Sequence, residues 1–461
     1  MSRFAPNLLK KYKLWPQWFA VLEVMMLSMS IGMTGGWASP YLAKLTSKNS
    51  SLPITEAEAS WVASILSIGR ICGSILGAIF VEVLGSKTSL LLSGIPQAAS
   101  WVLLIIANSV EWIYAARTLA GVALGIYFCS FPLYIGEISE PRIRGALVAL
   151  CSNGMPIGGL IGSLMGPYLS MAEFSYTSLV PTMLFLFIFL LLPSSPHYLV
   201  RSEKMEKAAK SIQWYSQDAD VDAELLALKN FIEANGKKQP FWKLLKEFIV
   251  PKNRRALILT NVLFLFMQLS GLYSIIFYLE IIMIRAQVTA VQPASVVIML
   301  SATGMVSGWF GMYFIDKYGR RVLLCTSSAG VAVAMTLLGL HFMLLDLGYD
   351  PQLLQWIAIT SLLLYQLSLY IGIVMVPPTI LSELFSPNIK STASAITNIN
   401  SGLFSFVSSK TYQPMVDVLT EKYVFWIYGV FVLLLIIYTI FKIPETKGKS
   451  LQEIQEILAK T

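Results

Sequence analysis

Two short stretches of the chain carry the same three residue types at the same spacing. In each, a glutamate is followed four residues later by a proline and seven residues later by a cation: Glu137, Pro141 and Arg144, then Glu383, Pro387 and Lys390. Carboxylates and cations at helix ends can form ion pairs, but one exposed pair contributes only about 0–1 kcal/mol. A network of pairs is needed to bias an equilibrium between two conformations. The repeat therefore indicates a charged latch.

Further charges lie in a second pair of matching stretches. Glu82 follows the second apolar run of the chain, and Asp316 follows the eighth. Duplication of one unit is the simplest explanation of such pairs. We expect ion pairs between the two halves that hold one face closed and break when it opens; simple anchoring of helix ends is the alternative. The predicted gating residues are Glu82, Arg117, Glu137, Arg142, Arg144, Asp316, Arg320, Arg321, Glu383 and Lys390.

The elements that position these charges are apolar. The chain of 461 residues is 56 % hydrophobic and 13 % charged, with a mean hydropathy of +0.66. Runs long enough to cross about 30 Å of hydrocarbon recur along it. They lie near 17–37, 60–82, 88–108, 111–134, 146–169, 175–193, 255–284, 291–315, 322–345, 352–381, 391–413 and 423–442. This pattern predicts an all-α membrane protein with twelve transmembrane helices in two six-helix bundles related by a pseudo-twofold axis.

The expected domain organisation follows from these runs. A tail (1–16) precedes the first bundle (17–195), a helical linker (196–252) joins it to the second bundle (253–443), and a second tail (444–461) follows. Apolar residues at helical spacing predict three short linker helices, one from Ser202, one at about 220–234 and one at 241–248. Their stripes predict packing beneath the bundles or at the membrane interface. Stabilising a gate and merely joining the halves remain alternative roles.

The basic residues predict the orientation. Most of the 34 lysines and arginines lie in the tails, in the segment 201–252 and in short loops on the same side. Such an excess marks the cytosolic side. We therefore expect a multi-pass plasma-membrane protein with both termini in the cytosol. The net charge of +8 is then a topology signal that needs no nucleic-acid partner.

Catalytic and metal-binding patterns are not found in the sequence. Gly448-Lys449-Ser450 resembles the end of a phosphate-binding loop, but position 443 holds isoleucine where the loop requires glycine. His197 and His341 are isolated, and the four cysteines lack the spacing of metal ligands. We expect no enzyme activity, no cofactor and no metal. One glycosylation sequon begins at Asn49 in a loop that is predicted to lie outside.

Glycines and prolines lie in or beside the first, fourth, seventh and tenth runs, which correspond between the two halves. The first adjoins Pro40 and the fourth contains Gly121, while the seventh places Gln268 close to Gly271 and the tenth contains Gly372. In transporters, broken helices at corresponding positions mark the solute site. We expect these four helices to be interrupted, although close helix packing also explains glycines.

Several motifs resemble those of the sugar porters of the major facilitator superfamily, over about residues 15–450. They are GGWASP (35–40), PLYIGEISEPRIRG (132–145), PSSPHYL (193–199), MQLSG (267–271), DKYGRR (316–321) and PETKGKSLQEIQ (444–455). GGWASP and the pair Gly69-Arg70 look most like the insect facilitated trehalose transporters. The resemblance implies alternating access and a sugar substrate.

Many of the family's hexose-binding positions carry other residues here. Ser152 stands in place of a glutamine, Pro378 in place of a tryptophan and Ser401 in place of an asparagine, whereas Gln268 is retained. An unpartnered buried hydroxyl costs about 1–3 kcal/mol, so glucose should bind poorly. A larger or differently placed saccharide is one expectation, and loss of transport or a non-sugar solute is the other. The predicted substrate-binding residues are Gln268, Met267, Tyr273, Ser152, Asn153, Pro378, Asn398, Asn400 and Ser401, with Gln413 as a further contact.

Arg70 lies near the middle of the second run, where a charge is costly and usually functional. We expect it to pair with Glu23, because their depths differ by only about 7 Å. In the family, proton-linked members carry a carboxylate midway along the first helix, where this chain has Met33. Gradient-driven sugar transport is therefore the leading prediction. The alternatives are a proton-coupled symporter and a non-transporting sensor or orphan carrier. The expected partners are a saccharide and the bilayer, with no obligate protein partner.

Overall fold

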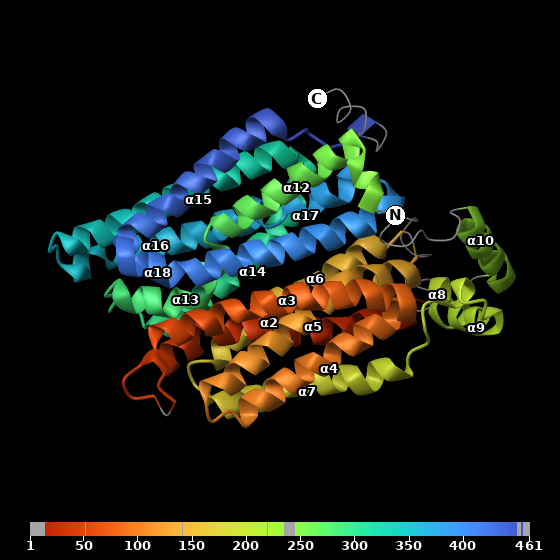
Figure 1. Cartoon of the computed structure of the whole chain (residues 1–461), viewed down its shortest axis with the longest axis horizontal. Coiled ribbons are helices and arrows are strands. Elements are labelled where there is room, and N and C mark those ends of the chain that lie inside the picture. Colours follow the sequence, from red (N-terminus) through yellow and green to blue (C-terminus); the bar gives the residue numbers. More distant parts are fainter. Residues whose placement is uncertain are drawn as a thin grey trace, which may run out of the picture.

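The computed structural model describes residues 14–50, 52–140, 142–218, 220–234, 245–449 and 453–454, and no strand occurs among them. Two helical bundles lie side by side (Figure 1). The first consists of α2 (Trp15–Thr46), α3 (Glu56–Leu84), α4 (Ser86–Ile105), α5 (Val110–Ile138), α6 (Arg144–Met165) and α7 (Met171–Leu191). The second consists of α12 (Pro251–Leu269), α13 (Leu272–Arg285), α14 (Pro293–Tyr318), α15 (Arg320–Asp346), α16 (Pro351–Ser368), the π-helix η2 (Leu369–Ile373), α17 (Val376–Leu384) and α18 (Pro387–Lys442).

The twelve expected spans can be recognised among these helices. In the described residues, eleven stretches are long and apolar enough to cross a membrane. The last of them, inside α18, contains Thr420 in a non-helical conformation with a φ of 69°, so it comprises two helices joined at a kink. The seventh span is made of α12 and α13, and the tenth of α16, η2 and α17. The predicted fold class is confirmed.

The expected interruptions occur in the second half only. Gly271 adopts a left-handed conformation with a φ of 84° and separates α12 from α13, and η2 interrupts the tenth span. In contrast, α2 runs without a break through Pro40, and α5 runs through Pro132. The prediction of breaks in these two helices was wrong, because their glycines serve close packing instead.

Gly158 shows how closely α6 approaches α2. A Cβ atom at this position would lie 1.9 Å from the carbonyl oxygen of Met29, so no side chain larger than hydrogen fits. We expect Gly158→Ala to lower the melting temperature of the protein in detergent, since overpacking of this kind costs about 1–3 kcal/mol. Gly35→Ala is the matched control: the same change on α2 meets no atom within 4 Å. Equal melting temperatures for the two variants would contradict this role of Gly158.

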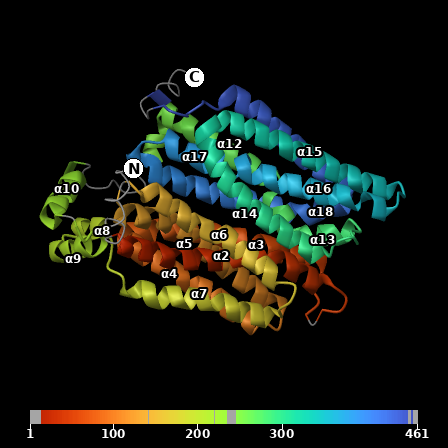
Figure 2. The same cartoon turned by 180° about the vertical axis from the view of Figure 1, so that it is seen from behind.

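The linker lies beyond one end of the first bundle (Figures 1 and 2). It contains α8 (Pro196–Arg201), α9 (Met205–Tyr215) and α10 (Val221–Ala234), followed by the short 3-10 helix η1 (Glu247–Ile249). The expected helices near 202 and 220–234 correspond to α9 and α10, whereas the first half of the one expected at 241–248 lies outside the described residues. Small apolar contacts around Leu199, Val200 and Ala208 hold α8, α9 and α10 together. We call this end of the bundles the linker end, and the opposite one the far end.

Hydrophobic contacts join the two bundles at the far end. Trp37 and Tyr41 of α2 belong to the same buried cluster as Ile275, Phe277 and Tyr278 of α13. The part of the first bundle nearer the linker packs in a separate cluster, which contains no residue of the second bundle among the described residues. The halves are therefore packed together at the far end.

Candidate functional site

Gln268 lies one residue before the end of α12, next to the break in the seventh span. Its amide nitrogen donates a hydrogen bond to Ser401 Oγ at 3.2 Å, and its backbone carbonyl accepts one from Ser408 Oγ at 2.9 Å. The side chain is fully buried, yet its Oε1 atom has no hydrogen-bond partner. An unsatisfied buried acceptor is costly. The Oε1 atom thus has capacity to accept a hydrogen bond from a further donor.

Gln366 of α16 is a second buried glutamine that can be considered for the site, and it was not among the residues predicted from the sequence. It is only 6 % exposed. A Cβ atom at Gly304 of α14 would lie 2.6 Å from its amide nitrogen and 3.3 Å from the ring of Tyr370. Gly304 thus makes room for this glutamine. An uncharged amide inside an otherwise apolar run was the signal available in the sequence.

The asparagines proposed for substrate binding are held in hydrogen bonds. Asn400 donates to Asn261 Oδ1 at 2.8 Å, and Asn398 accepts from Arg70 at 3.3 Å. Asn153 accepts from the indole of Trp309 at 2.9 Å. The last two contacts join the first bundle to the second. These amides therefore connect helices and halves, and a sugar would have to share or replace these partners.

The other proposed contacts lie in different surroundings. Met267 is buried in the hydrophobic core, and Tyr273 is partly buried with its ring 5.5 Å from that of Phe277. Ser152 is exposed and bonds back to the carbonyl of Val148 in its own helix, and Pro378 is exposed. The structure thus places Ser401 in direct contact with Gln268 but gives Met267 the environment of a packing residue.

The predicted ion pair between Glu23 and Arg70 is wrong. The guanidinium of Arg70 donates to Asn398 and lies over the ring of Phe128, with 5.4 Å between charge and centroid. One carboxylate oxygen of Glu23 is buried without a hydrogen-bond partner. Similar depth in the membrane was not sufficient to predict which residue pairs with Arg70, since Arg70 bonds to Asn398 of the other half.

Arg117, proposed as a gating residue, is a buried cation near the far end. It donates to the carbonyl oxygens of Val62 at 3.2 Å and Thr34 at 2.8 Å. Its guanidinium lies 5.3 Å from the ring of Trp37 and 5.4 Å from that of Phe277, which belongs to the second bundle. Carbonyl dipoles and aromatic faces stabilise a buried cation. Arg117 therefore connects the two halves without a salt bridge.

At the linker end, the charges of the second bundle pair within that bundle. Arg320 forms an ion pair with Glu383 at 2.7 Å, and Thr446 donates to the same carboxylate. The carboxylate of Glu445 accepts from the backbone N–H groups of Arg320 and Arg321 at 3.1 and 3.0 Å. Burial raises the pKa of Glu445, but these and neighbouring backbone N–H bonds outweigh it and hold the pKa below its usual range.

The charges of the first bundle at this end also have partners of their own half. Glu137 accepts hydrogen bonds from Ser86 and Ser195, and Arg144 donates to the carbonyl of Ser139 at 3.4 Å. The carboxylates of Glu137 and Glu383 are both bound by donors of their own half, near the ends of the helices that carry them. In this structure Glu137 and Glu383 therefore form no ion pair across the halves among the described residues. The predicted pairs are expected to break when this face opens, and the closed end here is the far end, so the latch at the linker end stays a prediction.

The remaining predicted gating residues form no ion pair between the halves among the described residues. Glu82 is exposed, with its backbone carbonyl bound to Arg201 at 2.7 Å, and Arg142 and Lys390 are exposed. The side chain of Asp316 lies outside the described residues.

The asparagine of the glycosylation sequon, Asn49, is exposed in the turn after α2 at the far end.

Among the described residues, one ion pair joins the halves, and it lies at the far end in a cluster of charges that was not predicted as a gate. Arg285 at the end of α13 binds Glu56 of α3 at 3.1 Å and Glu421 of α18 at 3.3 Å. Gln413 donates to Glu56 and to Asp417, both at 2.7 Å. We call Glu56, Arg285, Gln413 and Glu421 the far-end latch. Arg285 is one of the few cations predicted on that side, and this scarcity was the usable signal.

Further hydrogen bonds join the halves in addition to the far-end latch. The backbone N–H of Glu280 donates to Ser39 Oγ at 2.9 Å, and Ser60 Oγ donates to the carbonyl of Lys410 at 3.3 Å. Ser67 and Ser405 share a hydrogen bond of 2.9 Å. Together with the shared core, they make the far end the closed end of the interface between the bundles.

Comparison with known proteins identifies relatives over nearly the whole chain. The model of the family described as "Sugar (and other) transporter" matches residues 20–458. The facilitated trehalose transporter Tret1 of Polypedilum vanderplanki is 30 % identical over 447 residues, covering 96 % of this chain and 88 % of that protein. Tret1 of Bombyx mori is 29 % identical, with 97 % and 87 % covered.

Solved structures with the same architecture include two of a bacterial transporter. The inward open conformation of the xylose transporter XylE from E. coli gives a TM-score of 0.79 at 19 % identity, covering 96 % of this chain and 99 % of that one. The proton:xylose symporter XylE bound to 6-bromo-6-deoxy-D-glucose gives 0.75 at 20 % identity, with 97 % and 99 % covered. These likenesses establish the major facilitator fold.

Proposed function

Because this chain belongs to the family of sugar (and other) transporters, we propose that it carries a saccharide down its concentration gradient, with trehalose as the first candidate. Membership of this family confirms the resemblance that the motifs indicated, and it identifies a transporter rather than an enzyme. The name of the relatives from Polypedilum vanderplanki and Bombyx mori supports trehalose.

The observation that carries the proposal is the free acceptor on Gln268. Its Oε1 atom is buried and unpartnered beside the break at Gly271, where a sugar hydroxyl is a suitable donor. Gln366 and Tyr273 supply further polar groups on neighbouring helices of the same bundle. Oriented amides that satisfy several hydroxyls discriminate a saccharide from an apolar solute.

The linker end is proposed to face the cytosol of a cell whose plasma membrane holds the protein. The excess of lysine and arginine at that end supports this orientation. The far-end latch then closes the route from outside. Alternating access requires that Arg285 release Glu56 when the far end opens.

Uptake of a panel of labelled saccharides into cells that express the protein tests the proposal. We expect trehalose to enter until its inside and outside concentrations are equal. Uptake of none of the saccharides, by protein that is folded and present at the cell surface, would favour a sensor or a carrier of another solute.

Gradient-driven transport also makes a prediction about Glu23. We expect sugar uptake to be unaffected by a protonophore, and Glu23→Gln to preserve that behaviour, because no partner links this carboxylate to a described polar group. The measurement is the final ratio of internal to external sugar. Accumulation above the external concentration that both a protonophore and Glu23→Gln abolish would instead establish proton coupling through Glu23.

A further inference from the structure

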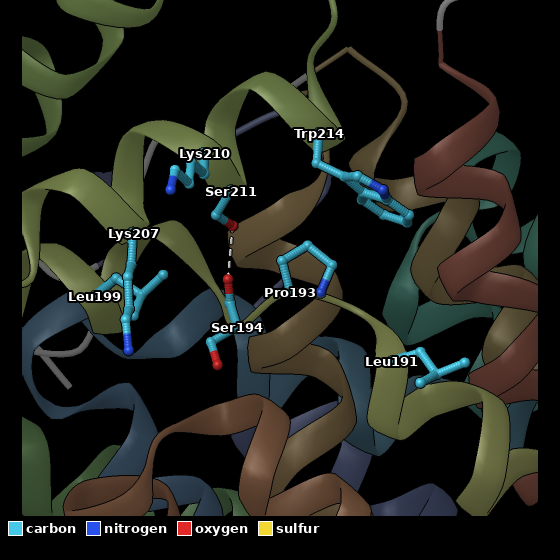
Figure 3. Close-up of a pocket in the computed structure, with 8 residues that line it drawn as sticks. All are labelled: Leu191, Pro193, Ser194, Leu199, Lys207, Lys210, Ser211 and Trp214. Carbon is cyan, nitrogen blue, oxygen red and sulfur yellow. Dashed lines mark hydrogen bonds between the residues drawn. The ribbon is translucent and has the colours of Figure 1, made fainter.

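A groove lies outside the transport path, where the first bundle meets the linker. Its volume is about 410 Å³, and it forms between the segment that follows α7 and one face of α9 (Figure 3). The lining residues are Leu191, Pro193, Ser194, Leu199, Lys207, Lys210, Ser211 and Trp214. A second hollow of about 400 Å³ shares Lys210 and Trp214 with it. We call the first the linker groove.

Hydrogen bonds hold the walls of the linker groove in place. Ser211 Oγ donates to the carbonyl of Ser194 at 2.6 Å (Figure 3), and Tyr215 OH donates to that of Pro193 at 2.9 Å. Gln17 of α2 donates to the carbonyl of Tyr215 at 3.1 Å. Because α9 is fixed to the first bundle at several points, the linker groove is preformed and need not be assembled by a ligand.

Two cations lie on one side of the linker groove without a counter-charge. Lys207 and Lys210 are three positions apart on α9, so they lie on the same face, and both are exposed. Neither ammonium group has an ion pair or a hydrogen bond within the described part of the chain. The carboxylate of Glu206 on the same helix is not part of the lining. This wall can therefore accept an anion.

The opposite wall continues the lipid-facing surface of a membrane-spanning helix. Leu191, the last residue of α7, is 81 % exposed, and Phe187 and Leu190 are also exposed. On the other flank, the ring of Trp15 at the start of α2 lies 6.0 Å from that of Trp214. Tryptophan favours the boundary between hydrocarbon and headgroups. The linker groove is therefore at the depth where acyl chains end and phosphates begin.

We propose that the linker groove binds an acidic phospholipid of the leaflet at the linker end. The headgroup phosphate contacts Lys207 and Lys210, and an acyl chain lies along Leu191 and the exposed face of α7. Such a lipid would fasten the linker to the membrane beside the first bundle. This role is independent of the transported solute.

Native mass spectrometry of the full-length protein, titrated with phosphatidylserine in detergent, tests the proposal. We expect Lys207→Gln/Lys210→Gln to weaken phosphatidylserine binding about tenfold or more, since each basic residue near a charged membrane surface contributes measurably. The matched control, Lys246→Gln/Lys449→Gln, removes the same charge from the end of the linker and from the C-terminal tail, outside the groove lining, and should retain the wild-type affinity. Phosphatidylcholine should bind more weakly than phosphatidylserine.

Four outcomes would overturn the proposal. Equal losses in the two double variants would mean that the lipid responds only to net charge. Equal binding of phosphatidylcholine would mean that the lysines do not recognise the headgroup. Displacement of the lipid by an equal concentration of inorganic phosphate would indicate a site for free phosphate. Displacement by a short polyglutamate peptide would indicate a protein ligand. All the exchanged lysines are exposed, so folding is checked simply by an unchanged melting temperature.

Discussion

Gln268→Ala is expected to reduce the uptake of the transported saccharide more than any other single change in the second bundle. The variant removes the buried Oε1 acceptor and also the hydrogen bond from Nε2 to Ser401. Losing a hydrogen bond to a buried sugar hydroxyl costs about 1–2 kcal/mol, which corresponds to a five- to thirtyfold lower uptake efficiency. Initial rates at a series of concentrations, corrected for the amount of protein at the cell surface, give this efficiency.

Gln355→Ala provides the control for Gln268→Ala. Gln355 is also a buried glutamine, but its side-chain oxygen accepts from the backbone N–H groups of Thr289 and Ala290 at 3.2 and 2.8 Å. The same substitution there should lower the melting temperature and leave the concentration of half-maximal uptake unchanged. If Gln268→Ala also changes only the melting temperature, Gln268 is a structural residue and the proposed sugar site is wrong.

Arg285→Gln is expected to open the far end. The substitution removes both ion pairs of Arg285, with Glu56 on the first bundle and with Glu421 on α18. Only the pair with Glu56 joins the halves, and an exposed pair contributes up to about 1 kcal/mol, so the equilibrium should shift up to about fivefold toward the far-end-open state. A cysteine in place of Ser60, which is buried between the halves, reports the change. Its reaction with an impermeant maleimide should accelerate.

Lys422→Gln is the control that removes a positive charge at the far end without removing a contact between the halves. Lys422 pairs with Asp346 at 2.9 Å, and both residues belong to the second bundle. This variant should leave the maleimide rate at position 60 unchanged. Exchanging the charges, with Glu56→Arg in the Arg285→Glu background, should slow the reaction again toward the wild-type rate. Equal acceleration by Lys422→Gln would mean that the far-end latch does not hold the halves together.

Features that depend on neighbours in sequence were predicted well. The spans follow from runs of apolar residues. The capping boxes that start α3 and α7, Thr55 with Glu58 and Ser170 with Glu173, are equally local but were not predicted, and both helices begin four residues before the expected runs. The break at Gly271 was also predicted, because a left-handed conformation suits glycine. The breaks expected in α2 and α5 were not observed. A glycine that permits a bend and a glycine that permits close contact look the same in a sequence, and Gly158 shows the second case.

Partnerships between distant residues were predicted poorly. Arg70 was assigned to Glu23 from depth alone, but it bonds to Asn398 on the other half. Glu137 and Glu383 bind donors within their own halves in this structure, which is closed at the far end, so the predicted pairing across the halves stays untested. The ion pairs of the far-end latch and Gln366 were missed, and Gln413, predicted as a substrate contact, is part of that latch instead. Each of these depends on the rotation of a helix about its axis and on the position of one bundle against the other.

The order of residues alone determined that this chain crosses a membrane many times as a duplicated helical unit, because hydrophobicity, helix length and duplication are properties of the chain itself. Only the tertiary structure decided which charges meet and which end of the interface is closed. An ion pair requires two charged atoms within about 4 Å, and side chains far apart in sequence reach that distance only after the two bundles have packed.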